Sequence, residues 1–163
     1  MDNFSHKAYW IGARAVLVKK KVNYESPAVE LRREFVLKKL PETAVCVICG
    51  LGSYELFLNG EKVNSDLLSP GFTTYDKRVL YLTYQVRKYL KKGINVVGVR
   101  LGDGFYNQTT EDTWDFYSVS WRDTPKLLFT LLADGEEVLV SDTDWQVNTQ
   151  GACYHNAVRT GEY

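Results

Sequence analysis

The stretch from residue 105 to residue 121, FYNQTTEDTWDFYSVSW, is rich in side chains that suit the binding of sugars. Aromatic rings stack on the apolar C–H faces of a pyranose, while carboxylates and amides form hydrogen bonds with its hydroxyl rim. The candidate sugar contacts are Asn107, Asp112, Trp114, Asp115, Tyr117 and Trp121. The alternative is packing, in which Trp114 and Phe116 alternate into a core and the other rings cover a neighbouring domain. Packing is slightly favoured over binding.

A turn just before this stretch offers oxygen ligands for a metal ion. Asp103 lies between two glycines, and its carboxylate could bind calcium together with Asn107 or Asp112. Acidic residues beside glycine are more often simple turn formers, because their side chains bond to nearby backbone groups. The turn is therefore the preferred interpretation, and calcium stays open as a cofactor.

The other reactive side chains do not match catalytic or metal-binding patterns. Cys46 and Cys49 spell C-x-x-C, but a redox pair needs its first thiol at a helix N-terminus. These two lie in an apolar segment typical of a strand, where their odd spacing places them on opposite faces. Cys153 and His155 lack the second ligand pair of a zinc site. We therefore interpret the cysteines as structural.

Hydrolysis of a sugar bond requires two carboxylates held about 5–10 Å apart. A chain with 20 acidic residues contains such pairs by chance, so the acidic residues of the aromatic stretch are no sign of catalysis. Gly50-x-Gly52 and Gly102-x-Gly104 lack the third glycine and the following helix of a dinucleotide site, and are interpreted as turns. No catalytic residue is predicted in this chain.

Alternating apolar and polar residues predict that β-strands carry these side chains. The expected strands are 28–37, 43–49, 54–58, 94–101, 126–132, 137–141 and, as a last core strand, 144–147. Asn59-Gly60 and Asp134-Gly135 predict tight hairpins, because both residues of each pair tolerate positive φ. A helical turn is expected over 86–90, with Gly93 closing it. Short strands without long amphipathic helices predict an all-β protein, an antiparallel β-sandwich of the jelly-roll (galactose-binding-like) type.

Length and composition limit the class of protein. A chain of 163 residues fits one domain, with a lead-in over 1–27 that holds a short strand at 15–18, and a sandwich over 28–163. Twenty basic residues balance 20 acidic ones, which argues against a nucleic-acid partner. We see neither a membrane-spanning apolar run nor a secretory signal. An odd number of cysteines, three, points to a reducing compartment, so a cytoplasmic location is expected.

Several motifs resemble the N-terminal β-sandwich domain of bacterial α-L-rhamnosidases, which are glycoside hydrolases. They are LRREFVL (31–37), GLGSYELFLNGEKV (50–63), LSPGFTTYDKRVLYLTYQV (68–86) and LKKGINVVGVRLGDGFYN (90–107). Phe105 stands where tryptophan is frequent in this family, which keeps the ring and loses the indole N–H donor. In the second half of PGFTTYDKRV, Arg78 is expected either to pair with Asp76 or to hold a loop with bidentate hydrogen bonds. A structural role in bracing the loop 64–78 is the preferred interpretation.

The resemblance implies a non-catalytic accessory domain of a larger glycoside hydrolase, with this chain as an excised N-terminal piece. Its implied partners are the catalytic and other domains of the parent enzyme and a rhamnose-containing carbohydrate. The alternative is an autonomous carbohydrate-binding module for L-rhamnose-type sugars, with calcium as a cofactor that such modules sometimes need. A third hypothesis, an independent small hydrolase, predicts turnover of an aryl rhamnoside by this chain alone.

Overall fold

The computed structural model describes residues 4–13, 27–108, 113–153, 156–157 and 161–162. The strands of one sheet are β1 (Val29–Leu37), β3 (Ser53–Leu58), β4 (Glu61–Lys62), β6 (Gly93–Gly102) and β9 (Gln146–Asn148). The strands of the other sheet are β2 (Ala44–Leu51), β5 (Leu82–Gln85), β7 (Lys126–Ala133) and β8 (Glu136–Val140). Two short 3-10 helices, η1 (Arg87–Tyr89) and η2 (Phe116–Ser118), and a separate strand pair, β10 (Asn156–Ala157) with β11 (Gly161–Glu162), complete the described elements.

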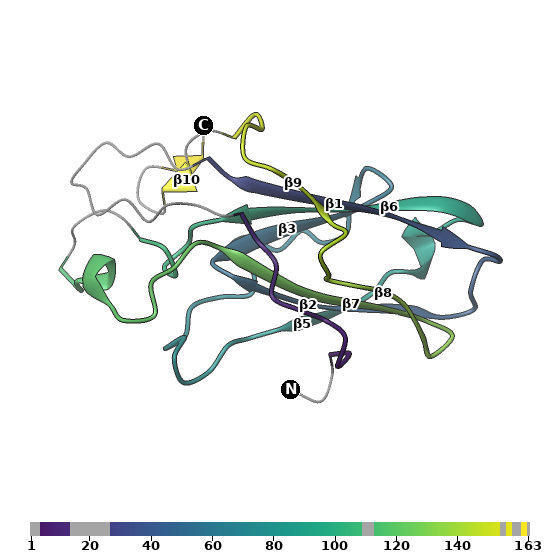
Figure 1. The fold of residues 1–163 in the computed structure, drawn as a ribbon, viewed down its shortest axis with the longest axis horizontal. Helices are drawn as coiled ribbons and strands as arrows, with labels where there is room; N and C mark the ends of the chain where they lie inside the picture. The colour runs from purple at the N-terminus through teal and green to yellow at the C-terminus, as the bar shows by residue number, and fades with distance from the viewer. Residues whose placement is uncertain (1–3, 14–26, 109–112, 154–155, 158–160, 163) are drawn as a thin grey trace.

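The two sheets lie face to face (Figure 1), which confirms the predicted antiparallel β-sandwich. The first sheet has the strand order β4-β3-β6-β1-β9 and the second has the order β5-β2-β7-β8. β6 is the centre of the first sheet, where it pairs along its length with β1 and with β3. Within the part of the chain that the structure describes, no helix is long and apolar enough to cross a membrane.

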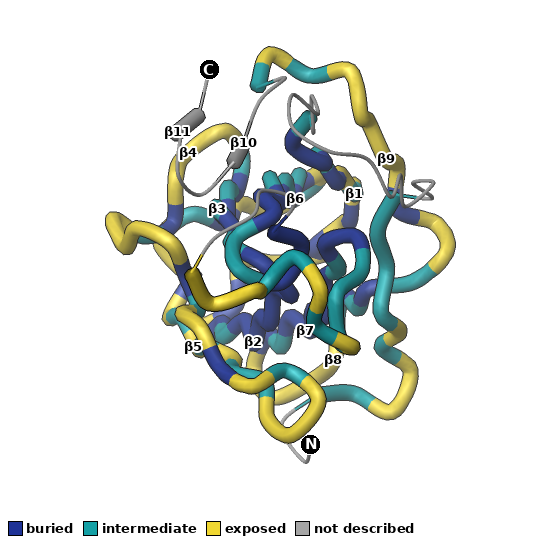
Figure 2. The backbone as a smooth tube through the Cα atoms, turned by 90° about the vertical axis from the view of Figure 1, so that its left-hand side faces the viewer, coloured by how far each residue is buried: buried dark blue, intermediate teal, exposed yellow. Residues whose placement is uncertain are grey.

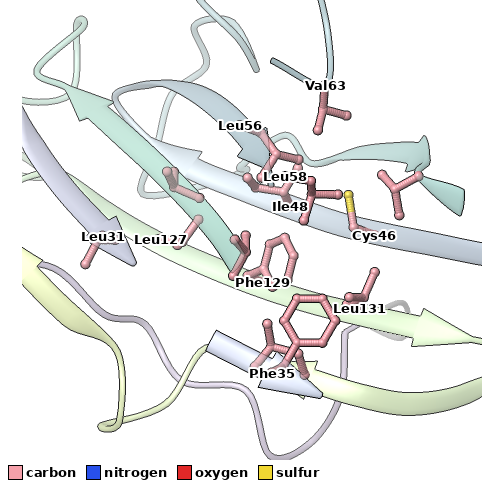
Figure 3. Packing of buried hydrophobic residues seen from close by; sticks show 14 of the residues in the cluster. Leu31, Phe35, Cys46, Ile48, Leu56, Leu58, Val63, Leu127, Phe129 and Leu131 are labelled. Atoms are coloured by element: carbon pink, nitrogen blue, oxygen red, sulfur yellow. The ribbon is translucent and has the colours of Figure 1, made fainter. Parts of the chain in front are cut away.

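The alternation of apolar and polar residues along the strands explains which side chains form the core. In β3 the residues alternate between half-buried and buried, and Leu56 and Leu58 are fully buried between the sheets. Figure 3 shows these leucines together with side chains from β1, β2 and β7, which meet across the gap. The labelled core residues from those three strands are Leu31, Phe35, Cys46, Ile48, Leu127, Phe129 and Leu131. The core thus sits between the sheets, as the alternation predicts.

Both predicted hairpins form, for the expected reason. Asn59 and Gly60 have φ angles of 52° and 88°, and Asp134 and Gly135 have φ angles of 51° and 81°. The turn at 86–90 is the 3-10 helix η1, and Gly93, the residue expected to close it, has a φ angle of 93°. Local turn chemistry therefore predicts these connections correctly.

The prediction of a last core strand over 144–147 is wrong. Only Trp145 of that segment is buried, and its indole N–H donates to the carbonyl of Val140 at 2.8 Å. The following strand, β9, is exposed and pairs with β1 at the edge of the five-stranded sheet. The reason is topological: after β8 the chain leaves its own sheet and crosses to the other one. β5 was not among the predicted strands, because its four residues are an edge strand with only weak alternation in burial.

Cys46 and Cys49 lie on opposite faces of β2, as their spacing predicts. Cys46 belongs to the core between the sheets, whereas Cys49 is buried under the opposite face, beneath loops. Burial raises the pKa of both thiols to about 12, so they stay protonated at neutral pH. These are the properties of structural cysteines.

The described N-terminal residues run along β7 and cover the outer face of the four-stranded sheet. Ile11 exchanges two backbone hydrogen bonds with Leu127, at 2.9 and 2.7 Å. The amide of Tyr9 donates to the carbonyl of Ser141 at 2.8 Å, and the Ser141 hydroxyl donates to the carbonyl of Tyr9 at 2.7 Å. This segment therefore protects part of a strand edge that β8 does not reach. The strand expected over 15–18 lies outside the described residues.

Candidate functional site

Loops from two parts of the chain gather at one end of the sandwich, at the left of Figure 1 and towards the viewer in Figure 2. They are the connection between β4 and β5 and the connection between β6 and β7, which opens with the turn after β6. The stretch that the sequence singles out for sugar binding lies in the second of these. This loop end is therefore the candidate functional site.

The turn after β6 is closed by two neighbouring polar side chains. Asp103 and Asn107 are buried, and Asn107 donates both its backbone N–H (3.1 Å) and its side-chain Nδ2–H (2.8 Å) to Asp103. The turn also needs glycine: a Cβ atom on Gly52 would lie 2.2 Å from the carbonyl oxygen of Gly102, and one on Gly104 would lie 3.0 Å from the backbone of Gly52. Backbone here packs directly on backbone, so these glycines serve the turn.

Seven rings from the two connections form one aromatic cluster, which consists of Phe72, Tyr75, Phe105, Tyr106, Trp114, Phe116 and Trp121. The ring of Phe72 lies 5.4 Å from Phe105 and 5.0 Å from Phe116, measured between centroids. Tyr75 extends the cluster to Tyr106 at 5.1 Å and to Trp121 at 6.3 Å. Edge-to-face and tilted contacts of this kind are the favoured aromatic geometries.

The expectation that Trp114 and Phe116 alternate into the sandwich core is wrong. Phe116 opens the 3-10 helix η2, and Asp115, just before it, has a left-handed φ of 54°. The segment is thus a turn, and its rings pack against other loops. Trp114 and Phe116 lie outside the cluster of buried residues between the sheets.

The structure places the predicted sugar contacts in different environments. Trp114 is 67 % exposed and its ring lies 6.1 Å from that of Phe116, so it stands at the outer edge of the aromatic cluster. Asp115 is exposed beside it, and Tyr117 and Trp121 are half-buried. Asn107 is buried against Asp103. Asp112 lies outside the described residues.

Two phenols and one carboxyl at this end have shifted pKa values. Burial alone would raise the pKa of Asp123, but the hydrogen bonds from Lys126 and from the Thr124 amide outweigh burial and lower it. Burial raises the pKa of Tyr75 to about 12 and that of Tyr106 also to about 12, with the nearby Asp123 carboxylate adding to the second shift. Both phenols therefore stay neutral and act as rings with a polar tip. None of the resolved shifts in the described residues moves a group towards neutral pH, where acid–base catalysts operate.

An apolar surface overlaps the aromatic cluster, with which it shares Phe72 and Trp114. We call it the apolar end patch; it consists of Leu67 (83 % exposed), Leu68 (67 %), Phe72 (45 %) and Trp114 (67 %). One pocket of about 200 Å³ is lined by Leu68, Phe72 and Phe105. The ring of Phe116 contacts both Phe72 and Trp114, and so connects these two members of the patch. Exposed aliphatic and aromatic side chains that adjoin one another usually mark an interaction surface.

Sequence reasoning missed the contribution of the β4–β5 connection to this end. Phe72 and Tyr75 come from that loop, and the aromatic stretch was singled out without them. The signal is present in the sequence: Leu67, Leu68 and Phe72 are large apolar residues beside Pro70 in a segment otherwise typical of a loop. Apolar residues in a loop need a partner surface, and here part of that surface is the aromatic cluster.

Residues 39–163 match the family described as Alpha-L-rhamnosidase N-terminal domain. The chain belongs to this family. An α-L-rhamnosidase from Formosa agariphila is 34 % identical over 140 residues, which cover 77 % of this chain and 14 % of that protein. A second α-L-rhamnosidase from the same organism is 30 % identical over 172 residues, covering 99 % of this chain and 18 % of the relative.

Solved α-L-rhamnosidases share the fold. The native enzyme from Aspergillus terreus superimposes with a TM-score of 0.82 at 29 % identity, over 96 % of this chain and 18 % of that one. The enzyme from Streptomyces avermitilis, solved in complex with L-rhamnose, gives a TM-score of 0.74 at 34 % identity, over 85 % and 14 %. The chain thus spans less than a fifth of the length of the relatives it matches.

Proposed function

We propose that this chain is a non-catalytic accessory domain of an α-L-rhamnosidase-like glycoside hydrolase, and that the apolar end patch packs against another domain of the same polypeptide. The observation that carries this proposal is the exposure of Leu67, Leu68, Phe72 and Trp114 at a single end of the sandwich. Surfaces between domains of one chain are apolar at their centre, and removal of the partner domain leaves them in water. Relatives several times longer than this chain supply such a partner.

The experiment compares two serine variants in the parent polypeptide. A Leu67→Ser, Trp114→Ser variant removes apolar contacts from the patch, while Ile94→Ser changes a residue that is 60 % exposed at the opposite end of β6. The patch variant is expected to lower the Tm of the parent polypeptide, and Ile94→Ser is expected to leave it unchanged. In the isolated chain, sedimentation velocity should show self-association that the patch variant abolishes.

Two results would contradict the accessory role. Equal Tm values for the patch variant and for Ile94→Ser would show that the patch does not pack against another domain. Turnover of an aryl α-L-rhamnoside by the isolated chain would support the independent hydrolase instead.

Carbohydrate binding is the second candidate function. It is favoured by the 67 % exposure of Trp114, whose indole packs at a tilt on Phe116 and stands beside the exposed Asp115. A largely exposed aromatic ring suits stacking on a sugar. Titration of the isolated chain with L-rhamnose, followed by tryptophan fluorescence, should give a saturable signal that Trp114→Ala removes. Absence of a response in the unsubstituted chain would leave the packing role alone.

Calcium dependence is a separate prediction of this second candidate. Ca²⁺ takes six to eight oxygen ligands, and the described residues contain no group of three or more Asp, Glu, His or Cys side chains that could hold a metal ion. Asp103 and Asn107 contact each other, and Oδ1 of Asn107 is buried without a hydrogen-bond partner in the described part of the chain. The described residues therefore fall short of a calcium site. The same titration in chelator tests whether the rest of the chain completes one.

A further inference from the structure

A pocket of about 400 Å³ lies on the outer face of the four-stranded sheet, next to the aromatic cluster. Buried Cys49 of β2 and Leu128 of β7 belong to its floor. Its walls include Phe4 and Trp10 from the N-terminal segment and Tyr75, Val79 and Tyr81 from the β4–β5 connection. The volume falls within the range of about 300–1,000 Å³ that is usual for small-molecule sites.

Contacts of the aromatic wall residues with one another and with their surroundings hold the walls of the pocket in place. Phe4 and Tyr81 meet edge to face with their centroids 5.7 Å apart, which joins the two walls. Tyr75 packs on Tyr106 at 5.1 Å, and Trp10 lies between Tyr9 and Ile11, whose backbones bond to the sheet. A site with rings already fixed loses little conformational entropy on binding.

Three consecutive charged residues, Asp76, Lys77 and Arg78, also line this pocket, and all three are exposed. Among the described residues, none of their side chains forms a hydrogen bond or an ion pair, so the expected pairing of Arg78 with Asp76 is not found. The backbone braces the turn instead: the amides of Lys77 and Arg78 donate to the carbonyl of Thr74 at 2.8 and 3.0 Å. Two cations and a carboxylate thus remain available beside an aromatic cavity.

We propose that this pocket binds a pyranose that carries a carboxylate, such as a uronate residue of an oligosaccharide. The aromatic walls suit the C–H faces of the ring. The guanidinium of Arg78 can hold a carboxylate with two parallel hydrogen bonds, and Lys77 adds a second positive charge. Asp76 accepts hydrogen bonds from hydroxyl groups. This inference does not depend on the accessory role proposed above.

The aromatic walls and the three charged residues of the pocket together favour one class of ligand over others. A neutral sugar would leave both cations unused. A phosphate dianion would gain from Lys77 and Arg78, but it would leave the aromatic walls without a partner. A simple carboxylic acid would leave the aromatic walls without a partner. Only a ring with both hydroxyl groups and one negative charge uses the walls, the cations and Asp76 together.

The experiment titrates the isotopically labelled chain with D-glucuronate and D-galacturonate, and with D-glucose, D-galactose, L-rhamnose and acetate, followed by amide NMR. At least one uronate should give saturable shifts at Trp10 and at residues 75–81, with a Kd about ten-fold lower than that of its neutral counterpart. Acetate should bind at least as weakly as the neutral sugars.

Three substitutions test the assignment of the charges. Arg78→Gln should weaken uronate binding about ten-fold. The affinity of Arg78→Lys should lie between those of Arg78→Gln and the unsubstituted chain, because lysine keeps the positive charge but cannot form two parallel hydrogen bonds with a carboxylate. Lys92→Gln is the matched control, since it removes an exposed cation outside the pocket and should change nothing. The amide spectrum of each variant shows directly that it is folded.

Four results would overturn the proposal. They are equal affinities for a uronate and its neutral counterpart, equal affinities for a uronate and acetate, unchanged binding by Arg78→Gln, and the absence of saturable shifts in this pocket with either uronate. Shifts confined to Trp114 would also count against it, because they would place the ligand in the other candidate site. None of these results bears on the Tm comparison that tests the accessory role.

Discussion

The ring of Phe72 lies 5.0 Å from the ring of Phe116, centroid to centroid, although the strands β5 and β6 separate them in the chain. This contact joins the β4–β5 connection to the β6–β7 connection at one end of the sandwich. It links the exposed residues of the apolar end patch to the aromatic cluster. The loop end of this protein is therefore a packed unit with an apolar surface.

Replacement of Phe72 should show how much this packing stabilises the protein. Phe72→Ala removes ring contacts with Tyr75, Phe105 and Phe116, and because Phe72 is 45 % exposed we expect a loss of about 1–2 kcal/mol in the free energy of unfolding. Urea unfolding followed by far-UV circular dichroism measures the loss. Leu67→Ala, at a residue that is 83 % exposed, is the control and should stay within about 0.5 kcal/mol. Equal effects would show that the ring contacts contribute nothing.

Two glycine substitutions separate backbone strain from steric clash. Gly52 and Gly60 have φ angles of 108° and 88°, but only at Gly52 would a Cβ atom meet other atoms, 2.2 Å from the carbonyl oxygen of Gly102. Gly60→Ala should cost about 1–2 kcal/mol from its φ angle alone. Gly52→Ala should cost clearly more, because the turn after β6 must also move. Thermal unfolding of both variants tests this order, and a smaller effect at Gly52 would refute the close approach.

The buried side chain of Asn95 should stabilise the end of the sandwich that holds the Asn59-Gly60 hairpin. Its side chain is fully buried, accepts from the Lys91 amide at 2.9 Å and donates to the Lys91 carbonyl at 2.7 Å, besides accepting from Asn59. Asn95→Ala removes these hydrogen bonds, while Asn59 keeps its bond to the carbonyl of Tyr89, and we expect a loss of about 2–3 kcal/mol in the free energy of unfolding. Chemical unfolding measures it, with the exposed Asn148→Ala as control. A loss below about 0.5 kcal/mol would mean that water replaces the lost bonds.

The carboxyl group of Glu55 should make the free energy of unfolding depend on pH in the acidic range. Burial alone would raise the pKa of this carboxyl, but its hydrogen bonds and ion pairs with Lys62 and Arg100 outweigh burial and lower it. Because the folded-state pKa lies below the unfolded one, the unfolded chain binds more protons in the window between them. The stabilisation is therefore present above the unfolded pKa and is lost as the pH falls through the folded pKa.

The measurement compares the original chain with Glu55→Gln in urea at pH 7 and at pH 3. The variant should be less stable at pH 7, and the difference between the two proteins should shrink at pH 3. Lys62→Gln removes one partner of the same carboxylate. It should therefore also reduce the change in the free energy of unfolding between pH 7 and pH 3. A difference that stays constant with pH would exclude the ion pairs as its source.

The strands and turns of this fold could be predicted from the sequence where their causes are local. β1, β2, β3, β6, β7 and β8 were expected close to their observed bounds, because alternating burial leaves a period of two in each segment. The hairpins at Asn59-Gly60 and Asp134-Gly135 followed from residues that accept positive φ. The opposite facing of Cys46 and Cys49 followed from their spacing in a strand.

Which of these elements meet depends on the tertiary structure. The crossing of the chain from β8 to β9, the contacts of Phe72 and Tyr75 with the 105–121 stretch, and the pocket between Trp10 and Arg78 all join residues far apart in sequence. No local pattern encodes such contacts, because they depend on how the two sheets stack and where each loop then ends. Local patterns in the sequence thus account for six of the strands, for both hairpin turns and for the resemblance to the family; the packing of the sandwich accounts for which side chains share a surface.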